Sequence, residues 1–437
     1  MTSAMMRATA VGLGCLVLAC GGGDGPPTPT PSSLPTATPT PAQEQAVQVR
    51  WNQTFQHISG FGGSSAWHST PPSDAEADLL FSDKKGAGLS LHRVRIAPDG
   101  TTWEIPTARL SQARGAKIWA APWSPPAEWK SNGSTNNGGR LLPEHYQDWA
   151  DRLADFALSM EESGFPLIYL SAQNEPGWVA DWETCQWTPQ ELLTFIRDYL
   201  GPAVAKRGLD LPLLAPESQD WTTLRSFADP LLADPVAASY LGVIAVHPYG
   251  GSPFAYTTPS EMGKEFWETE WSTRALDSGM TSGLELARSI HNHLTTGSVN
   301  AYHYWWLTHA DLGASGGLIQ AGTVTKRLWV MGNYARFVRP GSRRIGAELL
   351  DPRVTASLSV SAYCNETATR LIIVAVNSNA VTQPIHCELG GVQVSEVVPW
   401  VTSDTLDLEA QTALPGRTSF SYDLPPSSVT TFVGPAQ

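Results

Sequence analysis

The sequence lacks the basic blocks and the cysteine spacings that mark nucleic-acid-binding and zinc-binding chains. It holds 28 Lys and Arg residues against 41 Asp and Glu residues, which gives a formal net charge of −13. Because no basic cluster is present to neutralise phosphates, we expect no nucleic-acid partner. None of the five cysteines has a Cys/His spacing of the zinc-site kind. We therefore expect neither a metal nor a cofactor.

Tryptophan, by contrast, is abundant. Many of the 17 tryptophans lie in stretches rich in Gly, Pro and Asn rather than in periodic segments. An aromatic ring in a loop offers a flat apolar face on which the C–H face of a sugar ring can stack. The alternative is that these rings fill a large core. The composition is thus compatible with a carbohydrate substrate without requiring one.

Residues 1–20 have the pattern of an export signal rather than of a folded segment. Arg7 precedes the apolar run Ala8–Ala19, about 12 residues long, which is too short to cross a bilayer as a helix of the mature protein. The small and aliphatic residues before Cys20 indicate a bacterial lipoprotein signal in which Cys20 is lipidated. The alternative is an ordinary signal peptide cut near the same place. Residues 21–45, rich in Gly, Pro, Thr and Ser, are expected to form an extended linker. We expect an exported bacterial protein, either anchored to a membrane or secreted.

Strand-like runs alternate with helical patterns over the middle of the chain. Eight such runs occur: Ile58–Gly62, Gly88–Ile96, Ala116–Ala121, Leu167–Gln173, Leu213–Glu217, Val243–His247, Glu265–Glu270 and Ala301–Leu307. This alternation predicts an α/β fold with a closed (β/α)8 TIM barrel over residues 57–338. An open doubly wound sheet is the rival, but no Gly-rich dinucleotide fingerprint follows the first strand.

Two of the intervening helices have clear ends. The apolar spacing and the flanking proline and glycine predict a helix over residues 143–163. A second helix begins with the capping box of Thr188 and Glu191, and we expect it to end at Gly201.

Beyond residue 339 the pattern changes to short strands separated by turn residues. The runs Val354–Tyr363, Arg370–Asn377, Ile385–Leu389, Gln393–Val398 and Ser427–Phe432 predict an appended antiparallel β-sandwich over residues 339–437. The strand-like segment Val47–Phe55 is expected to pair with this domain, so residues 46–56 are assigned to it. Cys364 and Cys387 lie here and could form a disulfide in an exported protein, which would leave Cys185 unpaired.

In a barrel of this kind, function resides where the strands end at the C-terminal face. The fourth predicted strand is followed by Asn174 and Glu175, and the seventh ends in Glu268-Thr269-Glu270, so each brings a carboxylate to the mouth. Glycoside hydrolysis requires two such groups, one to protonate the leaving oxygen and one to attack the anomeric carbon or activate water. Glu270 is nearer the mouth, and Glu268 could instead be a buried partner one layer down. The alternative for either acid is a helix cap or a solvated side chain.

Several motifs resemble those of glycoside hydrolase family 30. In chain order they are Gly60–Trp67, Leu89–Ile96, Ala121–Pro126, Gln173–Pro176, Ala215–Ser218, Val246–Gly250, Trp267–Glu270 and Phe337–Gly341. The resemblance implies a barrel fused to a β-sandwich, with Glu175 as the acid/base and Glu270 as the nucleophile of a retaining mechanism. It also implies a set of substrate-binding side chains: Asn174, Trp123, Arg93, His247, Tyr249, Trp67 and Trp305.

Alternatives remain for some of these residues. Arg93 and His247 could have a structural role inside the barrel. Of Trp305 and Trp306, which end the eighth predicted strand, only one is expected to face the site because side chains alternate along a regular strand.

The resemblance leaves the sugar open, since family members act on xylan, β-1,6-glucan, β-1,6-galactan or glucosylceramide. The long loop Ser131–Arg140 resembles the bacterial xylanase branch, in which an arginine and a tyrosine after the eighth strand bind the glucuronate side group. Here residues 308–317 contain Asp311, and no arginine follows before Arg327. An anionic branch would be repelled there rather than held.

We therefore expect a monomeric endo-β-1,4-xylanase that acts on a plant cell-wall polysaccharide and does not strictly depend on glucuronate. One alternative is a β-1,6-glucanase or β-1,6-galactanase of the same family. The other is not an enzyme but a lipoprotein that binds polysaccharide on a degenerate barrel.

Overall fold

The computed structural model describes residues 42–275, 277–310 and 316–437. The expected signal segment with Cys20, most of the expected linker, and Asp311 lie outside the described residues. Within the described parts, no helix is long and apolar enough to cross a membrane.

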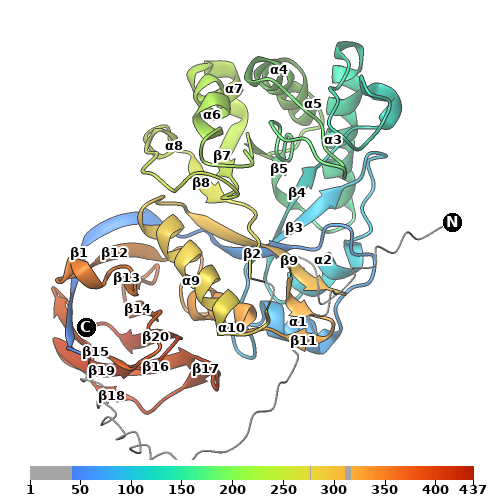
Figure 1. Cartoon of the computed structure of the whole chain (residues 1–437). Helices are drawn as coiled ribbons and strands as arrows, with labels where there is room; N and C mark the ends of the chain where they lie inside the picture. The colour runs from blue at the N-terminus through green and yellow to red at the C-terminus, as the bar shows by residue number, and fades with distance from the viewer. Residues whose placement is uncertain (1–41, 276, 311–315) are drawn as a thin grey trace, which may run out of the picture. The chain divides into compact units, whose positions relative to one another are not determined.

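Eight parallel strands close into a barrel (Figure 1). Neighbours in the sheet follow the chain order from the first strand to the eighth, and the eighth, β9, pairs with both β8 and β2. The strands are β2 (Gly60–Ser64), β3 (Leu91–Ile96), β4 (Lys117–Pro122), β5 (Leu167–Ser171), β6 (Leu213–Leu214), β7 (Leu241–Val246), β8 (Glu265–Glu268) and β9 (Ala301–His309). The predicted TIM barrel is confirmed. Two short strands, β10 (Gly317–Gln320) and β11 (Thr323–Val324), extend the sheet beyond β9.

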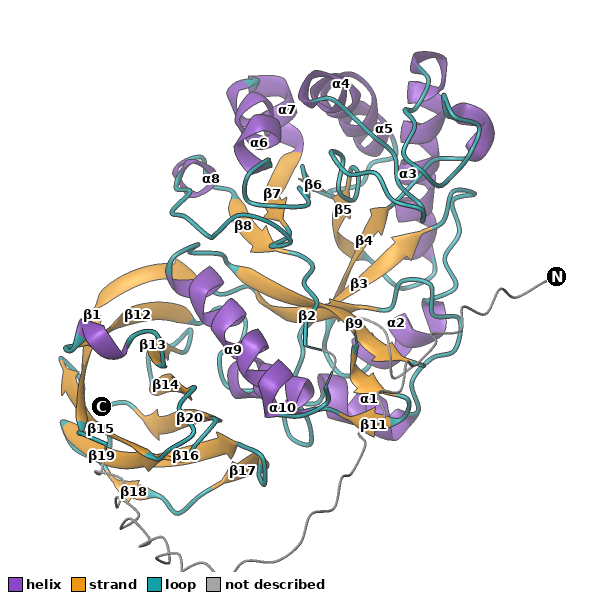
Figure 2. Cartoon of the chain, viewed as in Figure 1, coloured by secondary structure: helices purple, strands orange, loops and turns teal. Residues whose placement is uncertain are grey.

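Helices flank the barrel strands (Figure 2). They are α1 (Asp74–Phe81), α2 (Ile105–Gln112), α3 (Tyr146–Glu162), α4 (Pro189–Phe195), α5 (Gly201–Lys206), α6 (Leu224–Ala233), α7 (Pro235–Tyr240), α8 (Thr258–Glu261), α9 (Met280–Thr295) and α10 (Lys326–Ala335). Short 3-10 turns occur at Ala127–Trp129, Pro143–His145 and Pro352–Val354. The first of the two helices expected from sequence corresponds to the turn at residue 143 followed by α3.

The second expected helix does not end at Gly201. Its capping box forms as predicted, since the Thr188 hydroxyl accepts from the Glu191 amide and the Glu191 carboxylate accepts from the Thr188 amide. The chain then passes through a π-helical turn, Ile196–Leu200, into α5. A Cβ on Gly201 would lie 2.2 Å from the Tyr240 ring. This glycine therefore permits close packing of the continuing helix rather than ending it.

The C-terminal region forms a ten-stranded sheet that is antiparallel except where β1 pairs with β15. Its strands are β1 (Gln45–His57), β12 (Arg343–Leu349), β13 (Leu358–Cys364), β14 (Arg370–Asn377), β15 (Gln383–Gly390), β16 (Glu396–Thr402), β17 (Asp407–Ala410), β18 (Leu414–Pro415), β19 (Ser419–Leu424) and β20 (Ser428–Pro435). Buried residues from β1, β12, β14, β16, β19 and β20 share one apolar cluster, so the sheet must fold over on itself. In Figure 1 the blue β1 lies among the orange and red C-terminal strands.

The expected Cys364–Cys387 disulfide is wrong. Both thiols are buried and free, as is that of Cys185. Cys364 lies on β13 and Cys387 on β15, and the strands β12 and β1 stand between them in the sheet. Three strand spacings correspond to about 14 Å along a sheet, whereas a disulfide needs Cα atoms within about 7 Å.

The barrel and the C-terminal sheet share apolar packing through α9 and α10. The side-chain amide of Asn333 on α10 donates to the Trp400 carbonyl, and the Thr431 hydroxyl donates to the Asn333 carbonyl at 2.6 Å. Tyr363 and Val429 of the C-terminal sheet belong to the same buried cluster as the barrel core. The sheet therefore supports the barrel on the side of its last two helices.

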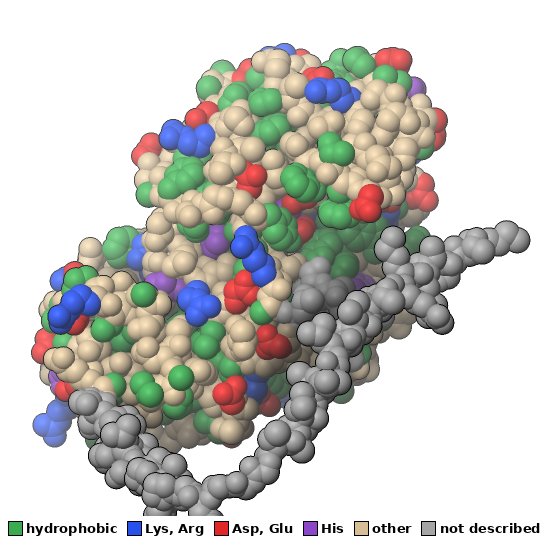
Figure 3. All heavy atoms as spheres, in the orientation of Figure 1, with side chains coloured by type: hydrophobic (Ala, Val, Ile, Leu, Met, Phe, Trp, Pro, Cys, Tyr) green, Lys and Arg blue, Asp and Glu red, His purple; other side chains and the backbone are tan. Residues whose placement is uncertain are grey.

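Surface charge is mixed on the face shown in Figure 3, where Lys and Arg side chains are scattered among Asp and Glu. The visible part of this face presents no continuous basic stripe of the kind that follows a nucleic-acid backbone.

Candidate active site

Glu175 lies in the turn that follows β5. Its backbone φ is 46°, a left-handed conformation that is uncommon for residues other than glycine. Its amide donates to the Glu217 carbonyl at 3.0 Å, and the preceding residue, Asn174, donates its amide to the Pro122 carbonyl at 2.9 Å. These bonds tie the turn to the ends of the neighbouring strands β4 and β6. The turn therefore holds the Glu175 side chain, in a residue only 6% exposed, at the mouth of the barrel.

Glu270 lies just beyond β8, and four groups surround it. Arg93 donates to its Oε2 at 2.5 Å, and the Tyr249 hydroxyl donates to its Oε1 at 3.0 Å. Its own amide donates to Glu268 Oε1 at 3.1 Å. His247 Nδ1 lies 4.0 Å from its Oε2. Both oxygens of Glu270 are thus oriented by fixed donors.

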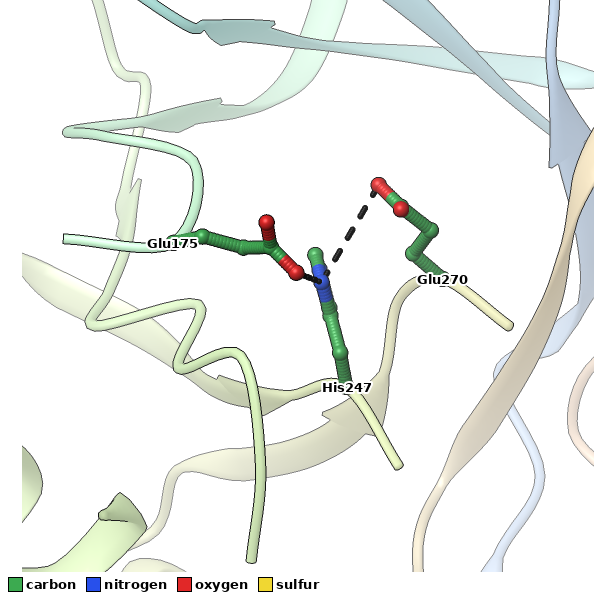
Figure 4. A group of neighbouring side chains, drawn as sticks. All are labelled: Glu175, His247 and Glu270. Carbon is green, nitrogen blue, oxygen red and sulfur yellow. Dashed lines mark hydrogen bonds and ion pairs between the residues drawn. The ribbon is translucent and has the colours of Figure 1, made fainter. Parts of the chain in front are cut away.

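The two carboxylates converge, as Figure 4 shows, with the His247 ring beside both. One oxygen of Glu175, one oxygen of Glu270 and a ring nitrogen of His247 all lie within 4.8 Å of one another. His247 Nδ1 is 3.0 Å from Glu175 Oε1. A separation of about 5 Å is the spacing at which a second carboxylate attacks a sugar directly, whereas wider pairs leave room for a water molecule.

Arg93, on β3, connects Glu270 of this pair with two further side chains. Its guanidinium donates to Glu270 Oε2 at 2.5 Å, to Asn174 Oδ1 at 2.6 Å and to Glu217 Oε1 at 2.5 Å. Its guanidinium carbon lies 4.4 Å from the centre of the Trp123 ring. The side chain is fully buried, so its charge acts where little solvent screens it.

Glu217 also belongs to the site, although the sequence indicated it only as part of the motif Ala215–Ser218. It follows β6, has a φ of 55°, and is fully buried. Besides Arg93, it accepts from the Ser171 hydroxyl at 2.5 Å and lies 3.5 Å from His247 Nε2. Its position at a predicted strand end was the available signal. What sequence could not show is that Arg93 would reach it.

Burial and neighbouring charges shift the pKa values of these groups in different directions. Burial raises the pKa of Glu175. Although burial acts to raise it as well, the pKa of Glu217 is lowered by Arg93 and His247. Burial would lower the pKa of His247, but Glu270, Glu175 and Glu217 raise it to about 10. The Arg93 and His247 side chains thus lie among the carboxyl groups of Glu175, Glu217 and Glu270.

Glu268 has a different environment from Glu270. It is fully buried, and its oxygens accept from the backbone amides of Glu270 and His303 rather than from an arginine. Burial raises its pKa well above the ordinary value. It lies one layer below the mouth and supports the turn that carries Glu270.

A cavity of about 870 Å³ opens at this end of the barrel. Six of the residues singled out from sequence line it: Trp67, Trp123, Glu175, Tyr249, Glu270 and Trp305. The other three are buried behind the carboxylates: Arg93 and His247 contact the acids, and Asn174 accepts a hydrogen bond from Arg93. The cavity wall also includes Trp306 of β9. Trp178, Trp182 and Arg274 line it as well, and the sequence motifs did not indicate them because they lie in loops without a regular pattern.

Trp305 and Trp306 both line the cavity, so the expectation that only one would face it was wrong. Gly63 pairs with Tyr304 and the next residue, Ser64, pairs with Trp306, which leaves Trp305 as an extra residue opposite β2. Such an irregularity breaks the alternation of side chains. The two indole rings consequently stack, with centres 5.1 Å apart.

Glu175, His247 and Glu270 are also the group of described residues whose atoms are close enough to hold a metal ion. Their surroundings do not suit one. Arg93 already pairs with Glu270, and a His247 pKa of about 10 leaves both ring nitrogens protonated at neutral pH. A cation would have to displace these charges, so the arrangement is better described as an acid pair with internal counter-charges.

The sequence of this chain is similar to those of known glycoside hydrolases. Residues 79–295 match the glycosyl hydrolase family 30 TIM-barrel domain. Glucuronoxylanase XynC of Bacillus subtilis (strain 168) is 30% identical over an alignment covering 89% of this chain and 91% of that protein.

Solved structures are similar over the same extent. The glycoside hydrolase family 30 subfamily 8 xylanase Xyn30A from Clostridium acetobutylicum has a TM-score of 0.80 and 34% identity, covering 89% of this chain and 99% of that chain. A GH30 endoxylanase from Clostridium papyrosolvens C71 has a TM-score of 0.78 and 32% identity, covering 89% and 100%. This chain, with two carboxylates at the mouth of its barrel, belongs to glycosyl hydrolase family 30 and is an O-glycoside hydrolase.

Proposed function

We propose that this protein is a retaining endo-β-1,4-xylanase in which Glu270 is the nucleophile and Glu175 the acid/base. The observation that carries the proposal is the approach of the two carboxylates to within 4.8 Å in a cavity walled by tryptophans. This spacing favours direct attack by a carboxylate and net retention of configuration.

In the first step Glu270 attacks the anomeric carbon, and the bond to the leaving oxygen breaks as Glu175 donates its proton to that oxygen. Arg93 and Tyr249 hold the Glu270 carboxylate in place for the attack. In the second step Glu175, now ionised, takes a proton from water, whose oxygen attacks the same carbon and releases Glu270. The raised pKa of Glu175 suits the first role, and the nearby His247 cation stabilises its ionised form for the second.

Xylan as substrate is supported by the similar proteins, which are named glucuronoxylanase, xylanase and endoxylanase. Independence from glucuronate is supported by the lack of an arginine in residues 308–317. The next one, Arg327, is buried and donates to the Gly317 carbonyl and to Gln320. Arg274 does line the cavity, so a substrate carboxylate could be tolerated there without being required.

The test is a product profile by mass spectrometry on glucuronoxylan, arabinoxylan and β-1,6-glucan. Xylo-oligomers from both xylans would support the proposal. Cuts placed only beside glucuronate would overturn the independence from that group, and products from β-1,6-glucan alone would overturn the substrate. Tight glycan binding without any product would favour the polysaccharide-binding alternative.

Two variants test the assigned roles. Glu270→Gln should lose nearly all activity and remain folded by circular dichroism, and if it keeps more than a few per cent of the wild-type rate the nucleophile is wrongly assigned. Glu175→Ala should lose about 100-fold or more on xylan but much less on substrates with good leaving groups, which need no proton. Equal losses on both substrates would remove Glu175 from the acid role.

We also propose that the chain is exported and held at a membrane by lipidated Cys20, on the basis of its N-terminal sequence. Mass spectrometry of the protein from a bacterial membrane fraction would test this. A lipid on Cys20 would support anchoring, and an unmodified N-terminus in the medium would indicate secretion instead.

A further inference from the structure

Two exposed tryptophans extend the cavity beyond the catalytic acids. Trp178 is 46% exposed and Trp182 is 50% exposed, and both line the cavity that holds Glu175 and Glu270. They lie in the loop between β5 and α4, directly after the Glu175 turn. Isolated exposed apolar residues are common, but two large rings on one wall of a substrate cavity form a surface that a ligand can cover.

This loop is held by the neighbouring loop between β4 and α3. Backbone bonds join the two, from the Asn137 amide to the Ala180 carbonyl at 2.8 Å and from the Thr184 amide to the Thr135 carbonyl at 3.1 Å. The Gln186 amide also donates to the neighbouring loop. The loop that carries the tryptophans is therefore hydrogen-bonded to its neighbour on both sides of Trp182.

The buried side chain of Lys130 joins these two loops. The residue is 3% exposed, and its ammonium donates to Ser124 Oγ at 2.9 Å, to the Thr135 carbonyl at 3.1 Å and to the Thr184 carbonyl at 2.5 Å. Burial lowers its pKa. A buried ammonium that joins two loops through three oxygens, and takes no part in the chemistry proposed above, has positioning as its evident role.

The position of Trp178 defines which part of the substrate it meets. Its amide donates to the Glu175 carbonyl at 3.0 Å, so it adjoins the proposed acid/base. An acid that protonates the glycosidic oxygen faces the leaving sugar, because that oxygen departs with it. Trp123, in contrast, lies over Arg93 beside the proposed nucleophile.

We propose that Trp178 and Trp182 form a binding platform for the pyranose rings on the leaving-group side of the cleaved bond, and that Lys130 positions it. This inference rests on the proposed roles of Glu175 and Glu270. A platform on this side binds a chain that continues past the scissile bond, which is the requirement for cutting inside a polymer.

The experiment compares xylohexaose with β-xylobiosyl fluoride in the full-length protein. The fluoride has a single-atom leaving group and so cannot touch the platform. Trp178→Ala and Trp182→Ala should each lower kcat/KM on xylohexaose about five- to tenfold, the range expected for loss of one aromatic contact. Both should leave kcat/KM on the fluoride within about twofold of wild type.

Trp103→Ala is the matched control, because Trp103 is 55% exposed but is not among the residues lining the cavity. It should match wild type on both substrates. Lys130→Met should reproduce the selective loss on xylohexaose, and Lys130→Arg should restore part of it. A readout that depends on substrate length separates positioning from general destabilisation, which would lower both rates together.

Equal losses on the two substrates, or no loss on xylohexaose, would overturn the platform while wild-type hydrolysis of xylohexaose still supports the proposed function. A wild-type protein inactive on both substrates would overturn the proposed function and the platform with it.

Discussion

Replacement of Arg93 by methionine tests the charge balance at the centre of the barrel. The guanidinium contacts Glu217 and Glu270 at 2.5 Å each, and the side chains of Arg93 and Glu217 are fully buried. Methionine has a similar length but no charge, so it leaves two carboxylates without their main partner. Removing one member of a buried ion pair typically costs about 3–5 kcal/mol. We expect the free energy of unfolding at pH 7 to fall by about that amount.

The loss should depend on pH through Glu217. In the wild type Arg93 and His247 lower its pKa against the effect of burial, so its stabilisation is complete above the unfolded-state pKa and is lost as the pH falls through the folded-state value. Without Arg93, burial raises the folded-state pKa of Glu217. Its ionisation therefore destabilises the folded variant at pH values above the unfolded-state pKa. The difference in free energy of unfolding between wild type and variant should therefore become smaller from pH 7 toward pH 4.

Urea unfolding, followed by tryptophan fluorescence and far-UV circular dichroism, measures this difference when the two transitions coincide. Arg353→Met is the control, because Arg353 pairs with Asp351 on the surface with 84% of its side chain exposed. Its midpoint should not change. A loss below about 1 kcal/mol for Arg93→Met, the range of an exposed pair, would refute the reasoning. So would a difference that stays constant with pH.

Three further predictions concern Glu175, Arg274 and the cysteines. Because the proposed acid, Glu175, must be protonated and burial raises its pKa, kcat/KM on xylan should fall with rising pH only above the ordinary carboxyl range. This alkaline limb should be absent in Glu175→Ala assayed with β-xylobiosyl fluoride, and a limb that persists would belong to another group. Arg274→Gln should lower kcat/KM on glucuronate-branched xylan by about fivefold at most relative to unbranched xylan, since an exposed charge pair is weak; equal effects on both would exclude a contact with the branch. Thiol titration in urea without reductant should detect Cys185, Cys364 and Cys387, whereas a disulfide would hide two of them.

Local patterns in the sequence predicted the barrel strands, but not all strands of the C-terminal sheet, since β12, β17, β18 and β19 were not expected. Apolar runs spaced by helical segments located all eight barrel strands, because a strand buried on both faces needs such a run wherever it lies in the chain. The capping box at Thr188 was also readable, since its bonds join residues three apart. The prediction that a helix ends at Gly201 is wrong, because this glycine instead makes room for the ring of Tyr240, which lies far along the chain.

The candidate site could be predicted only in part. Glu175 and Glu270 could be predicted to lie together because each follows a predicted strand, and strand ends meet at one face of a barrel. The roles of Arg93 and Glu217 as neighbours could not be read, because 124 positions separate them and no spacing rule connects such residues. The inward turn of both Trp305 and Trp306 depends on an irregularity in pairing with β2, which leaves no mark in the composition of β9.

Periodicity and short motifs are properties of neighbouring residues, so they predicted the barrel, the resemblance to the family and the two carboxylates at the barrel mouth. Three features could come only from the folded chain: one oxygen of each acid lies within 4.8 Å of the other, Arg93 and His247 contact the acids, and Trp178 and Trp182 line the same cavity. These contacts depend on closure of the sheet. β5 and β8 are separated by two other strands, and only the curvature of a closed barrel brings the groups that follow them to one point.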